Sequence, residues 1–438
     1  MTEEVLSYES YGCTMNHGEA RAAASMLSGR GYSVLPPVEG KADPRAGTVL
    51  VFTCDVISST ERRMHRRIGE LLREGKNVFA AGCLASIAPE VLQEVHPGIT
   101  VMDSMGVSTL SNSLDVYFPS VGGTVVEFIP SGERLDSIVP ISTGCLGACT
   151  YCITRKARGG IASYSQDKIL EMVMKGISKG RREVLLTSQD NGAYGMDRGA
   201  KELPILLGRI TSTVEEGCRI RVGMMNPVHI MDIIEDLLEA YSDRKVFKFF
   251  HIPVQSGSDR LLSAMNRGYF ADDFTSMIRR IRDRYPGANI STDVIVGFPG
   301  EEEEDVDKTL ELLGEVRPDI LNITRFSPRP GTEAARMKGR VHGWVVKDRS
   351  RKLSQWHREM ISNGLEERLG FHKECLVTEI GKKGTLMARD DNYTPIVFKG
   401  EPELLGSFMD IRTSEVGSTY LLGAALPAST GRSGPGKI

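Results

Sequence analysis

The stretch STGCLGACTYCITRKARGG, residues 142–160, places Cys145, Cys149 and Cys152 within eight residues. A closed zinc site takes four protein ligands, and a ferredoxin-type four-iron cluster also takes four. No histidine or fourth cysteine lies near these three thiols in the sequence. Three thiolates on a four-iron cluster leave one iron without a protein ligand, and that iron can bind a small chelating molecule. The spacing therefore predicts an open metal centre.

The cysteine stretch opens a region of alternating strand-type and helix-type runs, from about residue 135 to residue 335. We expect six β/α units, which fit a partial parallel (βα)6 barrel better than a flat sheet. The cysteines follow the first strand, at the end of such a barrel that carries catalytic residues. The expected strands are 134–143, 182–188, 219–225, 246–254, 289–298 and 320–327, and the expected helices are 165–180, 202–217, 227–242, 274–287 and 304–316.

Residues 1–125 predict a smaller parallel α/β domain, and they hold a second group of three cysteines. Cys54 and Cys83 each end a strand-type run, and Cys13 stands before a helical stretch. Ligands collect beyond the carboxyl ends of the strands in an open parallel sheet. We therefore expect these three cysteines to meet at one edge. The remaining two, Cys218 and Cys375, have no partner in sequence and predict buried, inert side chains.

Three segments follow the barrel region, which we assign to residues 135–335. Residues 336–370 predict a basic helical connector whose lysines and arginines face few acids. Residues 371–425 hold short alternating runs that predict a small β-barrel of four or five strands. The Gly/Ser/Pro-rich tail, residues 426–438, predicts disorder. The fold class is α/β with a C-terminal β-barrel.

Composition limits the function classes. The chain has 438 residues, which predicts two or three domains. A formal net charge of −3 is too even to indicate a nucleic-acid partner by itself. The acidic N-terminal residues and the lack of an eighteen-residue apolar run predict neither a secretory signal nor a membrane span. We expect a cytoplasmic, monomeric enzyme.

The CxxxCxxC motif, with Tyr151 before its last cysteine and a barrel strand before its first, resembles the radical S-adenosylmethionine superfamily. With Cys13, Cys54 and Cys83 upstream, the chain resembles the methylthiotransferase family, and residues 371–425 are similar to a TRAM domain, an RNA-binding module. The resemblance spans residues 5–425 and is closest to the archaeal and eukaryotic enzymes that act on N6-threonylcarbamoyladenosine in tRNA. It differs at Phe52, where the family often has Asn. Further matching stretches are YGCTMN (11–16), LTSQDNGAYG (186–195), HIPVQSGSD (251–259), DVIVGFPGE (293–301) and SPRPGTEAARM (327–337).

The resemblance implies two [4Fe-4S] clusters, one on each group of three cysteines, with Cys145, Cys149 and Cys152 as the catalytic set. It also implies two molecules of S-adenosylmethionine, a reducing electron donor and a tRNA substrate. One S-adenosylmethionine methylates a sulfur at the N-terminal cluster. The other yields a radical that takes hydrogen from C2 of the modified adenine at position 37, which then receives the methylthio group.

Several alternatives stay open. The same chemistry could act on isopentenyladenosine in tRNA or on a ribosomal-protein side chain. A different class is a non-catalytic RNA-binding iron–sulfur protein, which would leave S-adenosylmethionine intact under reduction. A zinc-only protein would contain zinc, and neither iron nor sulfide.

Polar residues that follow predicted strands complete the candidate site. Gln189 and Asp190 follow one strand and Gln255 and Ser256 another, so either pair could contact S-adenosylmethionine or the substrate base, or cap a turn. We expect His251 to be a satisfied buried histidine. The glycines of 297–305 suggest close approach to a ligand, and the glutamates after them predict a solvated helix start. Arg155, Lys156 and Arg158, beside the open site, could attract a phosphate backbone or form a solvated loop.

Overall fold

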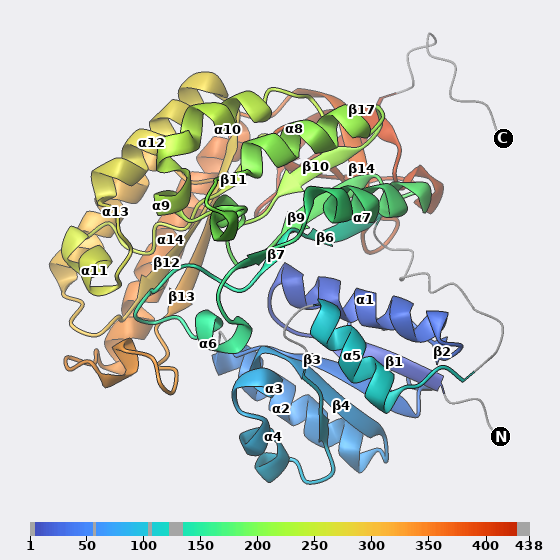
Figure 1. Ribbon diagram of the computed structural model, residues 1–438. Helices are drawn as coiled ribbons and strands as arrows, with labels where there is room; N and C mark the ends of the chain where they lie inside the picture. Colours follow the sequence, from blue (N-terminus) through green and yellow to red (C-terminus); the bar gives the residue numbers. More distant parts are fainter. Residues whose placement is uncertain (1–4, 56–57, 104–106, 122–134, 427–438) are drawn as a thin grey trace.

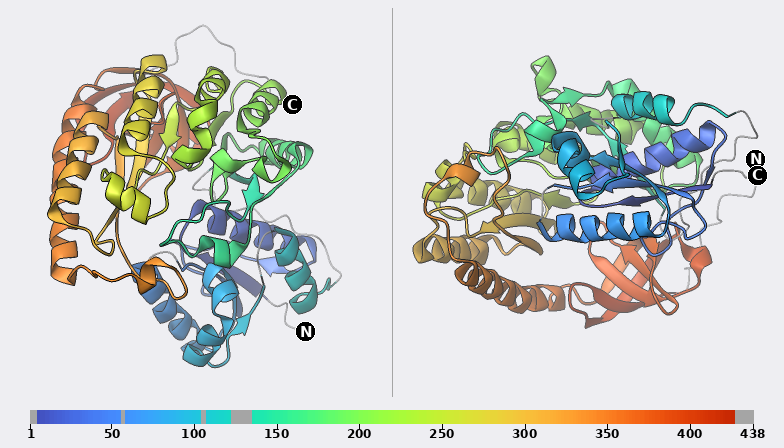
Figure 2. Two further views of the ribbon diagram at one scale, coloured as in Figure 1. Left: turned by 60° about the vertical axis from the view of Figure 1, so that its left-hand side comes forward. Right: turned by 90° about the horizontal axis from the view of Figure 1, so that it is seen from below.

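The structure is a computed structural model that describes residues 5–55, 58–103, 107–121 and 135–426. An α/β unit, a partial barrel of parallel strands and a closed β-barrel follow one another along the chain (Figure 1). The long helix α14 (Gly343–Glu366) runs along the outside of the partial barrel toward the β-barrel (Figure 2). The expected fold class is confirmed. The predicted disordered tail lies outside the described residues from position 427 onward.

The N-terminal unit is a five-stranded parallel sheet in the order β2-β1-β3-β4-β5. Alternate residues of β3 face opposite sides, as the period of a strand requires. Leu50 and Phe52 pack with α1 and α5, whereas Val49 and Val51 pack with α2. The elements are β1 (Val5–Ser10), α1 (Thr14–Gly29), β2 (Ser33–Val34), β3 (Thr48–Thr53), α2 (Ser58–Arg73), β4 (Asn77–Gly82), α3 (Cys83–Ile87), α4 (Pro89–Val95), β5 (Thr100–Val101) and α5 (Val107–Tyr117).

The central part forms the six expected parallel strands. They make two three-stranded sheets, and a parallel bridge between Ile220 and Val246 joins the sheets into one curved row. The strands are β6 (Asp136–Pro140), β9 (Glu183–Thr187), β10 (Arg219–Val222), β11 (Phe249–His251), β12 (Asn289–Val296) and β13 (Ile320–Arg325). A two-stranded ribbon, β7 (Ser142–Thr143) with β8 (Ala162–Ser163), frames the cysteine loop.

Helices cover the outer face of these strands, and one large apolar core fills the space between the two layers. The helices are α6 (Thr154–Arg158), α7 (Gln166–Ser178), α8 (Leu203–Thr213), α9 (Pro227–Ile230), α10 (Ile234–Ala240), α11 (Asp259–Ala264), α12 (Ala271–Arg284) and α13 (Glu303–Val316). Short 3-10 turns are η1 (Asn191–Ala193), η2 (Met196–Arg198), η3 (Met231–Ile233) and η4 (Ala334–Arg336).

Helix α14 occupies the basic connector, and its cations meet more acids than the sequence predicts. Arg349 Nη1 lies 2.8 Å from Glu301 Oε2, and Lys352 Nζ lies 3.0 Å from Asp307 Oδ1. Glu301 is buried and also accepts a hydrogen bond from the backbone of Gly297. The prediction of a solvated acidic helix start is therefore wrong for Glu301, because a distant helix supplies its partner.

Gly297 permits this packing. It has a φ of +81°, and a β-carbon there would lie 2.5 Å from a methyl group of Val346 on α14. The close approach at Gly297 is thus to a helix of the same chain.

The C-terminal unit is a closed barrel of five strands in the order β14-β15-β16-β18-β17. Strand β17 is not among the runs predicted from the sequence, although Met409, Ile411 and Thr413 alternate with the charged Asp410 and Arg412. Its elements are β14 (Phe371–Ile380), β15 (Thr385–Arg389), β16 (Pro395–Lys399), η5 (Pro402–Leu404), β17 (Phe408–Val416) and β18 (Leu421–Ala425).

The β-barrel is attached where the central strands begin. Tyr393 packs its ring against Phe247 and Phe249, and its hydroxyl donates to Glu183 Oε1 at 2.7 Å. Glu183 is the first residue of β9 and Phe249 the first of β11. The β-barrel therefore lies at the opposite end of the central strands from the cysteine loop. Over the described residues, no helix has the length and apolar character to cross a membrane.

We predict that Gly297→Ala lowers the free energy of unfolding by about 1–3 kcal/mol. The alanine would have to adopt the left-handed backbone conformation, and its β-carbon would clash with Val346. Thermal unfolding of the purified protein measures the effect. The matched control is Gly314→Ala in α13, where the nearest atom to a new β-carbon is Trp356 at 4.0 Å. Equal unfolding temperatures for both variants would contradict the packing described here.

Candidate active site

The barrel cysteine loop is held at the carboxyl end of the central strands. Cys145 N donates to Gly159 O at 3.2 Å, which closes the loop on itself. Gly144 has a φ of +73°, and a β-carbon there would lie 2.0 Å from Gly160 O, so the closure requires glycine. Thr150 anchors the loop from both sides, because its N–H donates to Met265 O and its carbonyl accepts from Ala334 N.

The three thiols of this loop lie near enough to one another to interact electrostatically. A β-carbon added to Gly147 would lie 3.5 Å from Cys145 Sγ and 3.8 Å from Cys149 Sγ. The backbone N–H of Gly147 donates to Cys145 Sγ at 3.3 Å, and that of Thr154 donates to Cys152 Sγ at 3.4 Å. Such N–H donors stabilise the negative sulfur of a metal-bound thiolate.

Burial governs the protonation of Cys145 and Cys152. It raises the pKa of Cys145 to about 12 and also raises the pKa of Cys152. Without a metal, both groups would hold their protons at neutral pH. A coordinating metal deprotonates a thiol outright, so this donor set fits a metal cluster.

Arg267 completes the barrel site, although no sequence pattern points to it. Its Nη1 donates to Cys149 Sγ at 3.1 Å and to the Tyr151 hydroxyl at 3.4 Å. Nη2 donates to Asn226 Oδ1 at 3.0 Å, and Nε to the Tyr269 hydroxyl at 3.2 Å. Burial is the main reason that the pKa of Tyr151 lies well above its usual value. Arg267 lies more than a hundred residues beyond the motif, so no spacing rule could include it.

Gln189 and Asp190 lie side by side but in different surroundings. Asp190 is buried, and its carboxylate accepts from Gly192 N and Asn226 N and lies 2.5 Å from His229 Nδ1. It therefore orders the turn after β9 and the start of α9. Gln189 Oε1 is buried without a hydrogen-bond partner in the described residues. Of the two, Gln189 is the residue with a polar atom left for a ligand.

Gln255 and Ser256 follow β11, and both form hydrogen bonds with other residues of the chain. Gln255 has a φ of +72°, and its backbone exchanges hydrogen bonds with Asp293 and Ile295 of β12. Ser256 Oγ is buried and accepts from Ser258 N at 3.1 Å. His251 has the expected partner, because its Nε2 lies 2.9 Å from Asp293 Oδ2, but it is half-buried and not buried as predicted.

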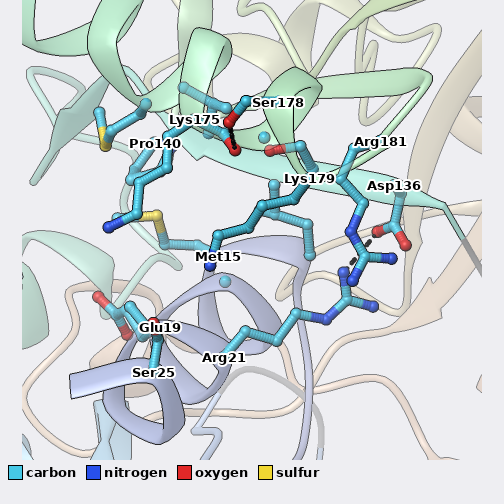
Figure 3. A pocket seen from close by; sticks show the side chains of 17 residues that line it. Met15, Glu19, Arg21, Ser25, Asp136, Pro140, Lys175, Ser178, Lys179 and Arg181 are labelled. Atoms are coloured by element: carbon cyan, nitrogen blue, oxygen red, sulfur yellow. Dashed lines mark hydrogen bonds and ion pairs between the residues drawn. The ribbon is translucent and has the colours of Figure 1, made fainter. Parts of the chain in front are cut away.

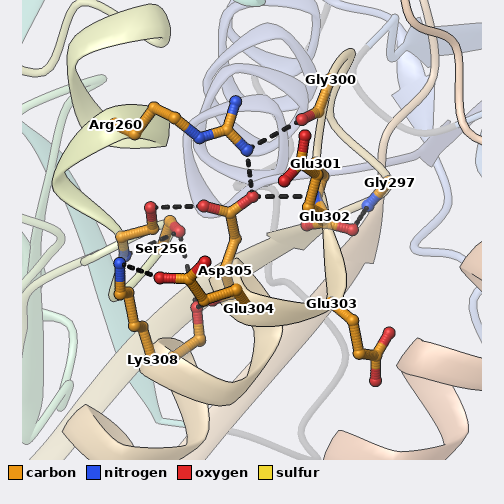
Figure 4. A network of polar contacts seen from close by, with 12 residues as sticks. Ser256, Arg260, Gly297, Gly300, Glu301, Glu302, Glu303, Glu304, Asp305 and Lys308 are labelled. Carbon is orange, nitrogen blue, oxygen red and sulfur yellow. Dashed lines mark hydrogen bonds and ion pairs between the residues drawn. The ribbon is translucent and has the colours of Figure 1, made fainter.

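The polar network beyond Ser256 centres on Asp305 of α13 (Figure 4). Asp305 accepts from Ser258 Oγ at 2.6 Å and from Glu302 N at 2.8 Å, and it forms an ion pair with Arg260. These bonds tie the turn after β11 to the start of α13. The network holds the rim of the barrel in place beside the cysteine loop.

The N-terminal cysteines meet at the carboxyl edge of their sheet. Cys54 and Cys83 directly follow β3 and β4, and Cys13 precedes α1. A β-carbon on Gly12 would lie 2.6 Å from Cys54 Sγ, so the Cys13 loop sits close against Cys54. Burial raises the pKa of Cys83 to about 11, and both other thiols lie near enough to contribute. Cys13 is exposed while the other two are buried, so the site has one open side.

Among the described residues, no three His, Cys, Asp or Glu side chains converge closely enough to hold a single metal ion. Thiolates on a four-iron cluster bind different irons, so they lie at separate corners and not around one point.

The three basic residues after the cysteine loop separate into two environments. Arg155 is exposed, and Lys156 is exposed with its Nζ donating to Gly331 O at 2.6 Å. Arg158 is buried and forms an ion pair with Glu19 of α1 at 2.5 Å. A buried Arg158 has no surface to offer a phosphate backbone, so only the first two fit that prediction.

Comparison with known proteins agrees with this site. Family models match residues 6–103 (Uncharacterized protein family UPF0004), 139–313 (Radical SAM superfamily) and 368–426 (TRAM domain). A "Probable threonylcarbamoyladenosine tRNA methylthiotransferase" of Archaeoglobus fulgidus is 40% identical over 433 residues, 95% of this chain and 98% of the relative. A "Threonylcarbamoyladenosine tRNA methylthiotransferase" of Danio rerio is 33% identical over 438 residues, 95% of this chain and 78% of the relative.

Among solved structures, the radical S-adenosylmethionine methyltransferase TsrM of Kitasatospora setae is similar in fold. Its TM-score is 0.52 at 13% identity, over 76% of this chain and 74% of that chain.

The partial barrel, with its cysteine loop at the carboxyl end of the strands, defines a radical S-adenosylmethionine enzyme, a class that uses a [4Fe-4S] cluster and S-adenosylmethionine. With 40% identity over 95% of its length, the chain belongs to the threonylcarbamoyladenosine tRNA methylthiotransferase family. The resemblance expected from the motifs is confirmed.

We predict that Gln189→Leu leaves the thermal unfolding temperature nearly unchanged but weakens S-adenosylmethionine binding roughly 3- to 10-fold. The reason is the loss of one hydrogen bond worth about 0.6–1.4 kcal/mol. Equilibrium dialysis of the reconstituted enzyme measures the affinity. Asp190→Asn should instead lower stability by about 1–3 kcal/mol, because it disrupts a buried carboxylate with three partners. If Gln189→Leu destabilises the protein and leaves binding intact, Gln189 is a structural residue.

Proposed function

We propose that this enzyme converts N6-threonylcarbamoyladenosine at position 37 of tRNA to its 2-methylthio derivative. The observation that carries the proposal is the presence of two three-cysteine sites, each at the carboxyl edge of its own sheet, with α6 packed between them. The names of the relatives supply the substrate class. We assign residues 1–125 to a second cluster, 135–335 to radical formation and 371–425 to RNA binding.

In this proposal, Cys145, Cys149 and Cys152 hold the barrel cluster and leave one iron open. When bound, that cluster and S-adenosylmethionine supply a radical for the C2 hydrogen of the adenine, which is too weakly acidic for a side-chain base. The side chains around this cluster hold its ligands in place and contact S-adenosylmethionine. Arg267 holds Cys149 and Tyr151 together, and Gln189 offers its free oxygen to the ligand.

Cys13, Cys54 and Cys83 hold the second [4Fe-4S] cluster in the proposal. When bound, this cluster would supply the iron that holds a sulfur atom for methylation. The exposed position of Cys13 leaves this site open on one side, whereas Cys54 and Cys83 are buried. The side of Cys13 therefore offers S-adenosylmethionine and the substrate a way to reach this cluster.

RNA binding is assigned to the β-barrel, with Arg155 and Lys156 as contacts to phosphates near the reacting base. Phosphate contacts position an RNA without reading its sequence. Since the β-barrel lies at the far end of the central strands from the cysteine loop, a tRNA that touches both must extend along the barrel.

We predict that Cys13→Ala, Cys54→Ala and Cys83→Ala together reduce the iron content from about eight to about four per chain. This variant should still cleave S-adenosylmethionine under reduction but form no methylthio product. The corresponding changes at Cys145, Cys149 and Cys152 should abolish cleavage as well. Iron and sulfide analysis after anaerobic reconstitution checks both, with Cys218→Ala as control. Zinc in place of iron, or unchanged iron in either triple variant, would refute the assignment.

We predict a single substrate class among three candidates. Reconstituted enzyme is incubated separately with tRNA carrying N6-threonylcarbamoyladenosine, tRNA carrying isopentenyladenosine, and ribosomes. Mass spectrometry should find the methylthio group on the first alone. Modification of either of the others at a comparable rate would replace the proposed substrate with that one.

A further inference from the structure

Arg158 reaches from the barrel cysteine loop into the N-terminal unit. Its side chain is 3% exposed, and every guanidinium nitrogen has a partner there. Nη1 donates to Glu19 Oε1 at 2.5 Å, Nη2 to Asn16 Oδ1 at 2.7 Å, and Nε to Cys83 Sγ at 3.4 Å. Arg158, which follows the barrel cysteines, therefore contacts Cys83 of the N-terminal site.

Asn16 extends this contact to the other two N-terminal cysteines. Its Nδ2 donates to Tyr11 O and to Thr53 O, each at 2.8 Å. Tyr11 lies two residues before Cys13, and Thr53 lies directly before Cys54. One buried network thus holds the chain beside all three cysteines.

The same short segment is fixed at the barrel site. Gly159, the residue after Arg158, accepts a hydrogen bond from Cys145 N at 3.2 Å. Helix α6 begins two residues after Cys152. The segment 152–159 therefore spans from one cysteine site to the other without an intervening flexible loop.

The hydrogen bond from Arg158 Nε to Cys83 Sγ favours electron uptake by a cluster bound there. The guanidinium of Arg158 is always charged, and Glu19 balances that charge. Hydrogen bonds to cluster sulfurs and nearby charge set the reduction potential of an iron–sulfur centre. An N–H directed at Cys83 Sγ stabilises the additional negative charge of the reduced state.

We propose that Arg158 is a positioning residue for the second cluster. Its side chain comes from the barrel cysteine loop, fixes Cys83 and raises the reduction potential of that cluster. The inference rests on the proposed cluster at Cys13, Cys54 and Cys83. The loop that holds the barrel cluster thereby influences the reduction potential of the second cluster.

The test uses the full chain with Cys145, Cys149 and Cys152 replaced by Ala, so that only the second cluster remains. In this parent, Arg158→Gln combined with Glu19→Gln removes the ion pair without leaving a buried charge unpaired. Redox titration followed by electron paramagnetic resonance measures the potential. We expect a shift to lower potential in the double variant, and a smaller one in Arg158→Lys.

The matched control removes another polar bridge between the two units. Arg21 of α1 and Asp136 of β6 form a salt bridge at 2.8 Å, beside a cavity of about 630 Å³ that separates the units there (Figure 3). Arg21→Gln with Asp136→Asn should leave the potential unchanged, because this pair touches no cysteine.

Three outcomes overturn the inference. A potential that is unchanged in the double variant removes the role of Arg158. An equal shift in the Arg21 and Asp136 control assigns the effect to docking of the units. A parent that binds no cluster refutes the second cluster itself, and the inference with it. Should the double variant fail to fold, the potential of Arg158→Lys decides, and one equal to the parent's overturns the proposal.

Discussion

The buried ion pair between Arg158 and Glu19 joins two units whose hydrophobic cores are separate. Removing one partner of a buried pair typically costs about 3–5 kcal/mol, because the other charge is left unpaired. The pair is therefore a geometric constraint more than a source of net stability. Because Arg158 belongs to the segment that closes the barrel cysteine loop, the constraint fixes one three-cysteine site relative to the other. The proposed reaction forms a radical at one site and takes the methylthio group from the other, so it requires such a fixed relation.

Parallel strands explain why both cysteine sites are where they are. The side chains that follow parallel strands collect at one edge, and both sheets use that edge for thiols. Glycine makes the closest approaches possible, at Gly12 beside Cys54 and at Gly144 beside Gly160. The opposite end of the central strands is used differently, since the β-barrel is docked there through Tyr393. Chemistry and RNA binding are thus assigned to opposite ends of the same strands.

The features that the sequence predicts are local ones. The cysteine spacing, the strand-end positions of Cys54 and Cys83 and the six β/α units each depend on residues close together in the chain. The contacts that long-range packing creates left no such pattern. Arg267 reaches Cys149 across 118 residues, and Arg158 reaches Glu19 across 139. Glu301 looks like a solvated helix start until Arg349 is brought to it. Long-range packing decides whether a charged residue faces water or a buried partner, and such packing leaves no pattern in the neighbouring sequence.

The position of Arg158 also affects how the protein is made. Ribosomes release the chain from its N terminus, so Asn16 and Glu19 emerge long before their partner. Until residue 158 follows, Glu19 lacks its cationic partner, and the edge that carries Cys13, Cys54 and Cys83 lacks the side chain that closes it. The first three cysteines to be synthesised therefore wait for a residue of the barrel cysteine loop before their edge is closed. The barrel cysteine loop is completed later still, because its anchors Met265, Arg267 and Ala334 follow more than a hundred residues further along the chain.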